Sequence, residues 1–239
     1  MTGAQLHTLF DILAWLAAGA SGWWVSRVGW VKFAPATTTL PYIAAVLFGA
    51  GVGAYVFGTA NMYFSGLLEP ARSVEGALAG GIIAVEIYKR IAGIRTRTGA
   101  RFALPLAVGI AVGRIGCYLG GLEDFTYGIP TSLPWGHDFG DGLPRHPVQL
   151  YESASMAAFA VFYVFCLWRR NIYVVENGFA LAVGFYALQR FMWEFLKPYG
   201  TLVGPFTLFH LLSIALLAYA IAMLATAPPL ENFHERAAA

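Results

Sequence analysis

Long apolar runs alternate with short polar segments along the whole chain. Each run is close to the roughly 20 residues that a helix needs to cross the hydrocarbon core of a bilayer. The runs are also longer and less interrupted than the alternating strands of a membrane barrel. The pattern predicts an all-α integral membrane protein, a single transmembrane domain over residues 1–239 with about seven spans at 7–26, 40–60, 74–92, 102–121, 149–168, 178–196 and 205–226.

The composition agrees with this class and excludes others. Of the 239 residues 12% are charged, whereas soluble domains carry about 25%. The net charge of +2, without a basic patch interleaved with aromatics, argues against nucleic acid as a partner. Cys117 and Cys166 lie in apolar runs, so neither a disulfide framework nor a zinc site is indicated. No metal-ligand spacing appears, so no metal and no organic cofactor are expected. The N-terminal segment lacks a positively charged region, so the first run is expected to be a retained span.

The basic residues of the loops predict the orientation, because loops rich in Lys and Arg stay on the cytoplasmic side. They gather on one side of the expected membrane, at Arg27, Lys32, Lys89, Arg90, Arg95, Arg97, Arg101, Arg169, Arg170 and Arg236. The other side carries Arg72, Arg145 and Lys197. We therefore expect the N-terminus outside, the C-terminus in the cytoplasm, and the Gly- and Pro-rich loop 122–148 on the outer side.

Two arginines lie inside apolar runs, Arg114 in the fourth and Arg190 in the sixth. An arginine at the bilayer centre costs about 2.5–3.5 kcal/mol on insertion scales. Binding an anion offsets this cost, and the commonest anion in a membrane is a lipid phosphate, which suits the forked guanidinium. The pair therefore indicates a binding site for a phospholipid headgroup.

Further polar residues accompany Arg190 on one helical face. Tyr186, Arg190, Glu194 and Lys197 recur every three or four residues, and such a face must avoid lipid tails. The alternative to a binding site is that Arg190 and Glu194 form an i,i+4 ion pair that only stabilises helix packing. The acidic residues that could neutralise the excess positive charge are Glu75 and Glu152.

Small residues flank Arg114 at Gly113 and Gly116. They would let a ligand or a neighbouring helix approach the backbone, and plain helix packing explains either glycine equally well.

Four segments of the chain carry a specific compound motif. They are Gly113-Arg-Ile-Gly116, Tyr127-Gly-Ile-Pro-Thr-Ser-Leu-Pro-Trp135-Gly, Arg145-His-Pro-Val-Gln-Leu-Tyr-Glu152 and Gly184-Phe-Tyr-Ala-Leu-Gln-Arg190-Phe-Met-Trp-Glu194-Phe. In order and spacing the set resembles the phosphatidylglycerol–prolipoprotein diacylglyceryl transferase family. A chance match to the first segment alone would be easy, but a match to all four is not.

This resemblance implies an enzyme that moves the diacylglyceryl group of phosphatidylglycerol onto a prolipoprotein cysteine thiol and releases glycerol phosphate. The reaction would take place at the outer face of the bacterial inner membrane. Arg114 and Arg190 match the family's essential arginine pair, and Tyr186 matches a functional tyrosine. The implied partners are the phospholipid substrate, an acceptor protein or small acceptor, and membrane lipid.

The chain departs from the family pattern at positions expected to handle the acceptor. Glu75 stands where the family has the histidine of a His-Gly-Gly motif. After Gly116 the chain reads Cys-Tyr-Leu-Gly-Gly-Leu-Glu-Asp instead of Asn-Phe-Ile-Asn-Gly-Glu, so Glu123 or Asp124 replaces the glutamate of the signature. The chain is therefore interpreted as a divergent member or paralogue.

The expected reaction is displacement at a glycerol carbon, with Arg114 and Arg190 stabilising the charge on the leaving phosphate. Glu75 is the first candidate for the base that takes the acceptor proton, because a desolvated carboxylate is a stronger base. His146 is the second, although the favoured interpretation of it is a loop histidine bonded to backbone near a helix start. Tyr186 is expected to bond the phosphate or position Arg190. The expected substrate-binding residues are Gly113, Gly116, Arg145, Gln149, Tyr151, Glu152, Glu194 and Lys197.

Two other functions remain open. A paralogue would use the same donor with a hydroxyl, amine or lipid acceptor, and a non-catalytic protein would bind or transport lipid. The sequence shows no internal repeat, which argues against a transporter. Cys117 could itself take the diacylglyceryl group, but the favoured interpretation is a small apolar residue packed beside Gly116.

Overall fold

The computed structural model describes residues 2–28 and 39–227, so Lys32 and Arg236, used above for orientation, lie outside the described residues. Each of the seven expected spans overlaps one long helix, with ends that differ by a few residues. The long helices are α1 (Gly3–Val28), α2 (Leu40–Phe64), α3 (Val74–Ile91), α4 (Ala103–Gly120), α5 (Val148–Trp168), α7 (Gly178–Glu194) and α8 (Leu208–Ala225). The short elements are η1 (Ala100–Phe102), η2 (Gly121–Asp124), α6 (Ile172–Glu176), β1 (His137–Asp138), β2 (Pro144–Arg145), β3 (Thr201–Val203) and β4 (Phe206–Thr207).

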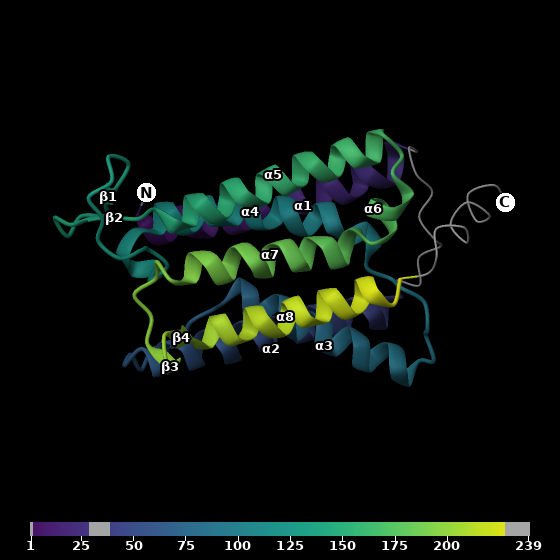
Figure 1. Ribbon diagram of the computed structural model, residues 1–239, viewed down its shortest axis with the longest axis horizontal. Helices are drawn as coiled ribbons and strands as arrows, with labels where there is room; N and C mark the ends of the chain where they lie inside the picture. The colour runs from purple at the N-terminus through teal and green to yellow at the C-terminus, as the bar shows by residue number, and fades with distance from the viewer. Residues whose placement is uncertain (1, 29–38, 228–239) are drawn as a thin grey trace. The chain divides into compact units, whose positions relative to one another are not determined.

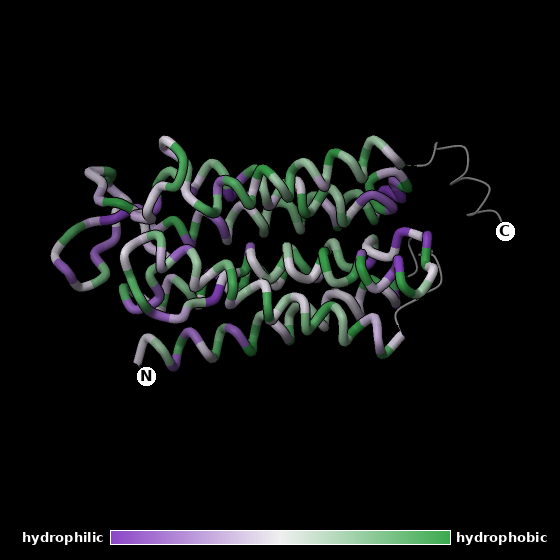
Figure 2. Tube along the Cα trace, turned by 90° about the horizontal axis from the view of Figure 1, so that it is seen from below, coloured by the Kyte–Doolittle hydropathy of each residue, from purple (hydrophilic) through white to green (hydrophobic). Residues whose placement is uncertain are grey.

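Within the described residues, five helices are long and apolar enough to cross a membrane: α1, α2, α4 with its flanking turns, α5 and α8. Helix α3 is less apolar because it carries charged residues at both ends. Helix α7 has 17 residues, about 26 Å at 1.5 Å per residue, against a hydrocarbon core of about 30 Å. Apolar residues run along the helices, and hydrophilic ones gather near helix ends and in connecting segments (Figure 2). The predicted all-α membrane class is confirmed.

The chain divides into two compact units, and the first contains α1, α4, α5, α6 and α7. Among the described residues, unit 1 comprises 2–28, 99–198 and 219–227. Helix α4 contacts α1, α5 and α7, which run alongside it (Figure 1). A Cβ added at Gly116 would lie 2.5 Å from the Cβ of Phe10, so this glycine permits the close approach of α1. The Ser153 hydroxyl donates to the Ala111 carbonyl at 2.7 Å and joins α5 to α4.

Among the described residues, unit 2 comprises 39–98 and 199–218, with α2, α3, the β3–β4 hairpin and the first part of α8. Thr39 caps α2 and Ser73 caps α3, each hydroxyl accepting a bond from a backbone N–H of the first turn. Helices α2 and α3 approach closely at their glycines. A Cβ at Gly53 would collide with the carbonyl oxygen of Gly76 and lie 2.8 Å from the Cα of Gly80. Gly53, Gly76 and Gly80 therefore permit this close packing.

The loop 122–148 is more ordered than the sequence indicated, because it contains the β1–β2 hairpin. His137 pairs with Arg145 and Asp138 pairs with Pro144. The turn between the strands needs positive φ at Gly140 and Gly142, and the Asp138 carboxylate accepts from both of their backbone N–H groups at 2.8 and 3.0 Å.

Candidate active site

A cluster of buried charged side chains lies within unit 1, where α4, α5 and α7 pack together. Its members are Arg114, Glu152, Arg190, Glu194 and Lys197. The Glu152 carboxylate is its centre: Oε2 contacts Arg114 Nε, while Oε1 lies 2.8 Å from Arg190 Nη1 and 3.3 Å from Lys197 Nζ. Arg190 Nη2 also lies 2.8 Å from Glu194 Oε2. The two arginines therefore converge on one carboxylate.

Helical spacing explains why these groups meet. Tyr186, Arg190 and Glu194 follow each other at four-residue intervals on α7, and all three are buried, as their shared face predicts. The i,i+4 ion pair between Arg190 and Glu194 is present. It is not the whole arrangement, because Glu152 reaches Arg190 from α5.

The charges of the cluster do not cancel. Arg114, Arg190 and Lys197 contribute three positive charges, and Glu152 and Glu194 contribute two negative ones, which leaves a surplus of one positive charge. Each cation has a partner, but a net charge buried in the protein still costs free energy. The surplus therefore favours a singly charged anion beside the guanidinium groups, whose forked donors match phosphate oxygens.

Lys197 connects this cluster to the loop 122–148. Its ammonium donates to the Thr126 carbonyl at 2.7 Å, and the Ile129 backbone N–H donates to the Leu196 carbonyl at 2.7 Å. Burial and the two nearby arginines lower the pKa of Lys197 to about 8, against the opposing effect of Glu152. The ammonium therefore changes its charge near physiological pH.

Gln149 lies on the same face of α5, one turn before Glu152. Its side chain is fully buried, and neither its amide oxygen nor its amide nitrogen has a hydrogen-bond partner among the described residues. Leaving such a group unsatisfied costs about 1–3 kcal/mol. The amide is therefore suited to bind a polar ligand within this part of the bundle.

The other polar residues before α5 make contacts within the hairpin segment. His146 Nδ1 lies 3.3 Å from the hydroxyl of Tyr151, which accepts a bond from Trp135 Nε1 at 2.8 Å. Arg145 donates to Asp141 at 2.6 and 3.0 Å and lies over the ring of Tyr127. The guanidinium holds the pKa of Asp141 below its usual range. Arg145 is thus engaged inside the hairpin, whereas Thr126 makes the contact with the cluster around Glu152.

Glu75 is buried in the first turn of α3, where its carboxylate accepts a bond from the Ser213 hydroxyl at 2.6 Å. It belongs to unit 2, while the arginine pair belongs to unit 1. Gly113 and Gly116 face α1, with the Cβ of Ala14 lying 3.6 Å from a Cβ added at Gly113. These contacts agree with the packing explanation of the two glycines.

A second polar cluster beside Arg114 was not predicted from the sequence. The Cys117 thiol lies 3.8 Å from His7 Nε2 and accepts a hydrogen bond from Arg114 Nη1 at 3.7 Å. It therefore makes polar contacts in addition to the apolar packing that we expected. His7 Nδ1 lies 3.1 Å from Asp124 Oδ1. The sequence offered no local signal for this cluster, because His7 and Cys117 are 110 residues apart.

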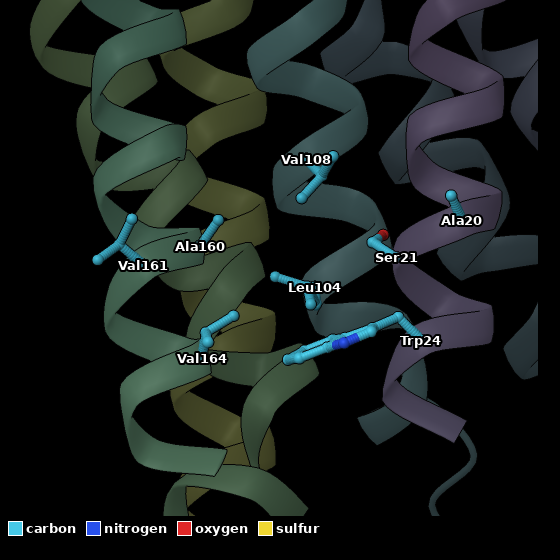
Figure 3. A pocket seen from close by; sticks show the side chains of 8 residues that line it. All are labelled: Ala20, Ser21, Trp24, Leu104, Val108, Ala160, Val161 and Val164. Carbon is cyan, nitrogen blue, oxygen red and sulfur yellow. The ribbon is translucent and has the colours of Figure 1, made fainter. Parts of the chain in front are cut away.

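An apolar pocket of about 440 Å³ opens between α1, α4 and α5 (Figure 3). Its lining residues are Ala20, Ser21, Trp24, Leu104, Val108, Ala160, Val161 and Val164. Val108 precedes Arg114 by six residues on α4, which is about 9 Å along the helix axis. The pocket carries no charged residue, so it suits hydrocarbon and not the chemistry of the cluster around Glu152.

Comparisons with known proteins agree with the resemblance seen in the sequence. The model of a family described as prolipoprotein diacylglyceryl transferase matches residues 12–226. A protein of Geobacter sulfurreducens named phosphatidylglycerol–prolipoprotein diacylglyceryl transferase is 33% identical over 191 residues, which cover 74% of this chain and 72% of that protein. A protein of the same name from Nitratidesulfovibrio vulgaris (strain Miyazaki F) is 32% identical over 206 residues, covering 77% and 74%.

No solved structure matches the chain. The family model nevertheless extends from α1 to the end of α8, and it includes every residue of the cluster around Glu152. The chain therefore belongs to the prolipoprotein diacylglyceryl transferase family.

Proposed function

We propose that this chain transfers the diacylglyceryl group of phosphatidylglycerol to a cysteine thiol of a prolipoprotein and releases glycerol phosphate. The names of the two relatives state this donor and this acceptor. The observation that carries the proposal is the buried cluster around Glu152, with its convergent arginines and its surplus of one positive charge. The phosphodiester of phosphatidylglycerol has a single negative charge, which matches that surplus.

Arg114 and Arg190 bind the donor phosphate in this proposal. A guanidinium has five N–H donors, so each arginine can contact Glu152 and phosphate oxygens together. Glu152 is a positioning residue that holds both planar groups at one place. Tyr186, one turn before Arg190, bonds the phosphate or orients that arginine, and Gln149 offers its amide to the headgroup.

The reaction forms a sulfur–carbon bond and breaks the bond between the glycerol carbon and the phosphate oxygen. The electron pair leaves with that oxygen, so the phosphate gains a second negative charge as the bond breaks. The arginine pair binds this charge more strongly than that of the ground state, which is the basis of catalysis. Glu75 and His146 remain our two proposed candidates for the base that takes the acceptor proton.

We further propose that α3 and α7 also cross the membrane, which makes seven spans in a bacterial inner membrane. The buried polar face of α7 accounts for its lower apolarity, because that face contacts protein and not lipid. With the N-terminus outside, the cluster around Glu152 lies toward the outer leaflet. The loop 122–148 then lies over the site as a periplasmic segment, and the contact between Lys197 and Thr126 supports this position.

The apolar pocket beside α4 is proposed to hold one acyl chain of the donor. Its distance of about 9 Å from Arg114 along the helix axis is within the reach of a chain whose phosphate is bound by that arginine. Residues of three helices line it, and all of them belong to unit 1 together with the arginines.

The proposal is tested with the purified protein in phosphatidylglycerol vesicles and a peptide that carries a lipoprotein signal cysteine. Mass spectrometry should show one diacylglyceryl group on the peptide cysteine, with an equal amount of glycerol phosphate. Arg114→Ala and Arg190→Ala should each lower the rate by about 10²–10³-fold, as loss of one transition-state donor does. Arg169→Ala, an exposed arginine at the end of α5, is the matched control.

Two results would contradict the proposal. Full activity of both arginine variants would remove the assigned roles. Repeated release of glycerol phosphate, many molecules per protein, with no change in peptide mass would show that another acceptor is used.

A further inference from the structure

Three side chains with acid–base or nucleophilic chemistry meet beside Arg114, apart from the groups that contact Glu152. His7 comes from α1, Cys117 from the last turns of α4, and Asp124 from η2. Cys117 is buried and free, and the side chains of His7 and Asp124 are 22% and 12% exposed. All three belong to unit 1, so their geometry is internal to one compact unit.

The contacts run in a line from a carboxylate to the thiol. His7 Nδ1 lies 3.1 Å from Asp124 Oδ1, and the Thr126 hydroxyl donates to the other carboxylate oxygen at 2.6 Å. A carboxylate only accepts hydrogen bonds, so Nδ1 carries a proton, and in the neutral form of the ring Nε2 is the acceptor. Nε2 faces the sulfur of Cys117 at 3.8 Å. Asp124 thus orients the imidazole, and His7 is placed to take the thiol proton.

A metal-binding role suits this geometry less well. The candidate ligand atoms of His7, Cys117 and Asp124 lie within 4.8 Å of one another. However, Cys117 and Asp124 contact opposite nitrogens of the ring, whereas a metal ion binds one nitrogen of a histidine. Nε2 faces two groups, the Asp11 carboxylate, with Oδ1 at 3.6 Å, and the thiol sulfur of Cys117 at 3.8 Å.

Arg114 connects the thiol to the proposed phosphate site. Its Nη1 donates to the sulfur of Cys117 at 3.7 Å, and its Nε contacts Glu152. In a displacement, one carbon separates the attacking atom from the leaving oxygen. A thiol and a phosphate that contact the same guanidinium are close enough for this arrangement.

We propose that Cys117 is itself an acceptor of the diacylglyceryl group, an inference that rests on the proposed function for its donor. The sulfur attacks the glycerol carbon bonded to the phosphate oxygen of phosphatidylglycerol, and the thiol proton passes to His7 Nε2. The sulfur–carbon bond forms as the carbon–oxygen bond breaks. The electron pair leaves with glycerol phosphate, whose charge Arg114 and Arg190 bind. No oxidant or second substrate is needed.

The product is a thioether, and a thiolate bound to an alkyl carbon is a poor leaving group. The diacylglyceryl group therefore stays on Cys117, and the step occurs once per chain. Without an acceptor peptide, each protein molecule releases one molecule of glycerol phosphate. The attached lipid then remains next to the donor site of the same molecule.

The test uses the purified full chain in phosphatidylglycerol vesicles without peptide. Intact mass spectrometry should show the addition of one diacylglyceryl group, fragment mapping should place it on Cys117, and hydroxylamine should not remove it. Cys117→Ser should lack the adduct, and Cys166→Ser, which changes the other cysteine, should keep it. His7→Ala should slow its formation by about 10²–10⁴-fold, the usual contribution of a general base. Added imidazole should restore part of that rate, which a purely structural role of His7 would not allow.

A parallel assay with the acceptor peptide separates this inference from the proposed function. Modified peptide with unmodified Cys117 overturns the inference and leaves the proposed function standing. No modification of either thiol overturns both. An adduct that hydroxylamine removes is a thioester formed by acyl transfer, and it also overturns the thioether. Stoichiometric zinc that is retained by the wild type and lost in Cys117→Ser overturns it in favour of a metal site.

Discussion

Replacing Glu152 with glutamine removes the charge at the centre of the buried cluster and keeps the shape of the side chain. Glu152 is fully buried and contacts Arg114, Arg190 and Lys197, so the variant removes the carboxylate charge that these three cations share. Breaking a buried ion pair by removing one partner costs about 3–5 kcal/mol. For a chain of this length each kcal/mol lowers Tm by about 2–4 °C, so Glu152→Gln should melt about 6–20 °C lower.

Thermal unfolding in detergent measures this change, with Glu86→Gln as the control. Glu86 makes a partly exposed i,i+3 pair with Lys89, and such pairs contribute about 0–1 kcal/mol. Phosphatidylglycerol should raise the Tm of Glu152→Gln more than that of the wild type, because its phosphate supplies a negative charge to the cations. Phosphatidylcholine, whose headgroup is neutral overall, should not. A Tm for Glu152→Gln equal to that of Glu86→Gln would refute the central role of this carboxylate.

Three further predictions concern pH, helix packing and the acyl pocket. The pKa of Lys197 is lowered to about 8, so its ammonium loses its proton as pH rises through that value, and KM for phosphatidylglycerol should rise there. Lys197→Arg should remove this pH dependence of KM. If KM of the variant still rose near pH 8, Lys197 would be excluded as its source. Gly53→Val should destabilise the protein by at least about 1–3 kcal/mol in thermal unfolding, because its side chain meets the α3 backbone, whereas Gly51→Val, which has open space, should cost much less. Ala160→Phe should reduce activity on long-chain phosphatidylglycerol about tenfold relative to activity on short-chain phosphatidylglycerol, which corresponds to the burial free energy of about two methylenes. The exposed Ala157→Phe should not change this ratio. Equal effects of the two variants on the ratio would place the acyl chain elsewhere.

Much of the fold followed from the sequence because the helices depend on local apolar patterns. Each expected span corresponds to a helix, since about 20 consecutive apolar residues must satisfy their backbone hydrogen bonds internally. The hairpin within 122–148 was not predicted. Its strands have two residues each, too few to show alternation, and its turn depends on Asp138 and two glycines.

The importance of Arg114 and Arg190 was also visible in the sequence, because a charge inside an apolar run has an energetic cost that needs an explanation. The carboxylate that both arginines contact was not visible there. The sequence offered Glu194, Glu75 and Glu152 as neutralising residues, and i,i+4 spacing identified only the first. The choice of Glu152 depends on how α4, α5 and α7 pack, which brings residue 152 within hydrogen-bond distance of residue 190.

The sequence by itself determined the membrane class, the helix positions and the two arginines, since each follows from local hydrophobicity or from the cost of one buried charge. Tertiary structure alone decided that Glu152 joins those arginines, and that His7, Asp124 and Cys117 form a line beside them. The physical reason is distance along the chain. A hydrogen bond acts over about 3 Å, and its partners can come from any two helices that pack together.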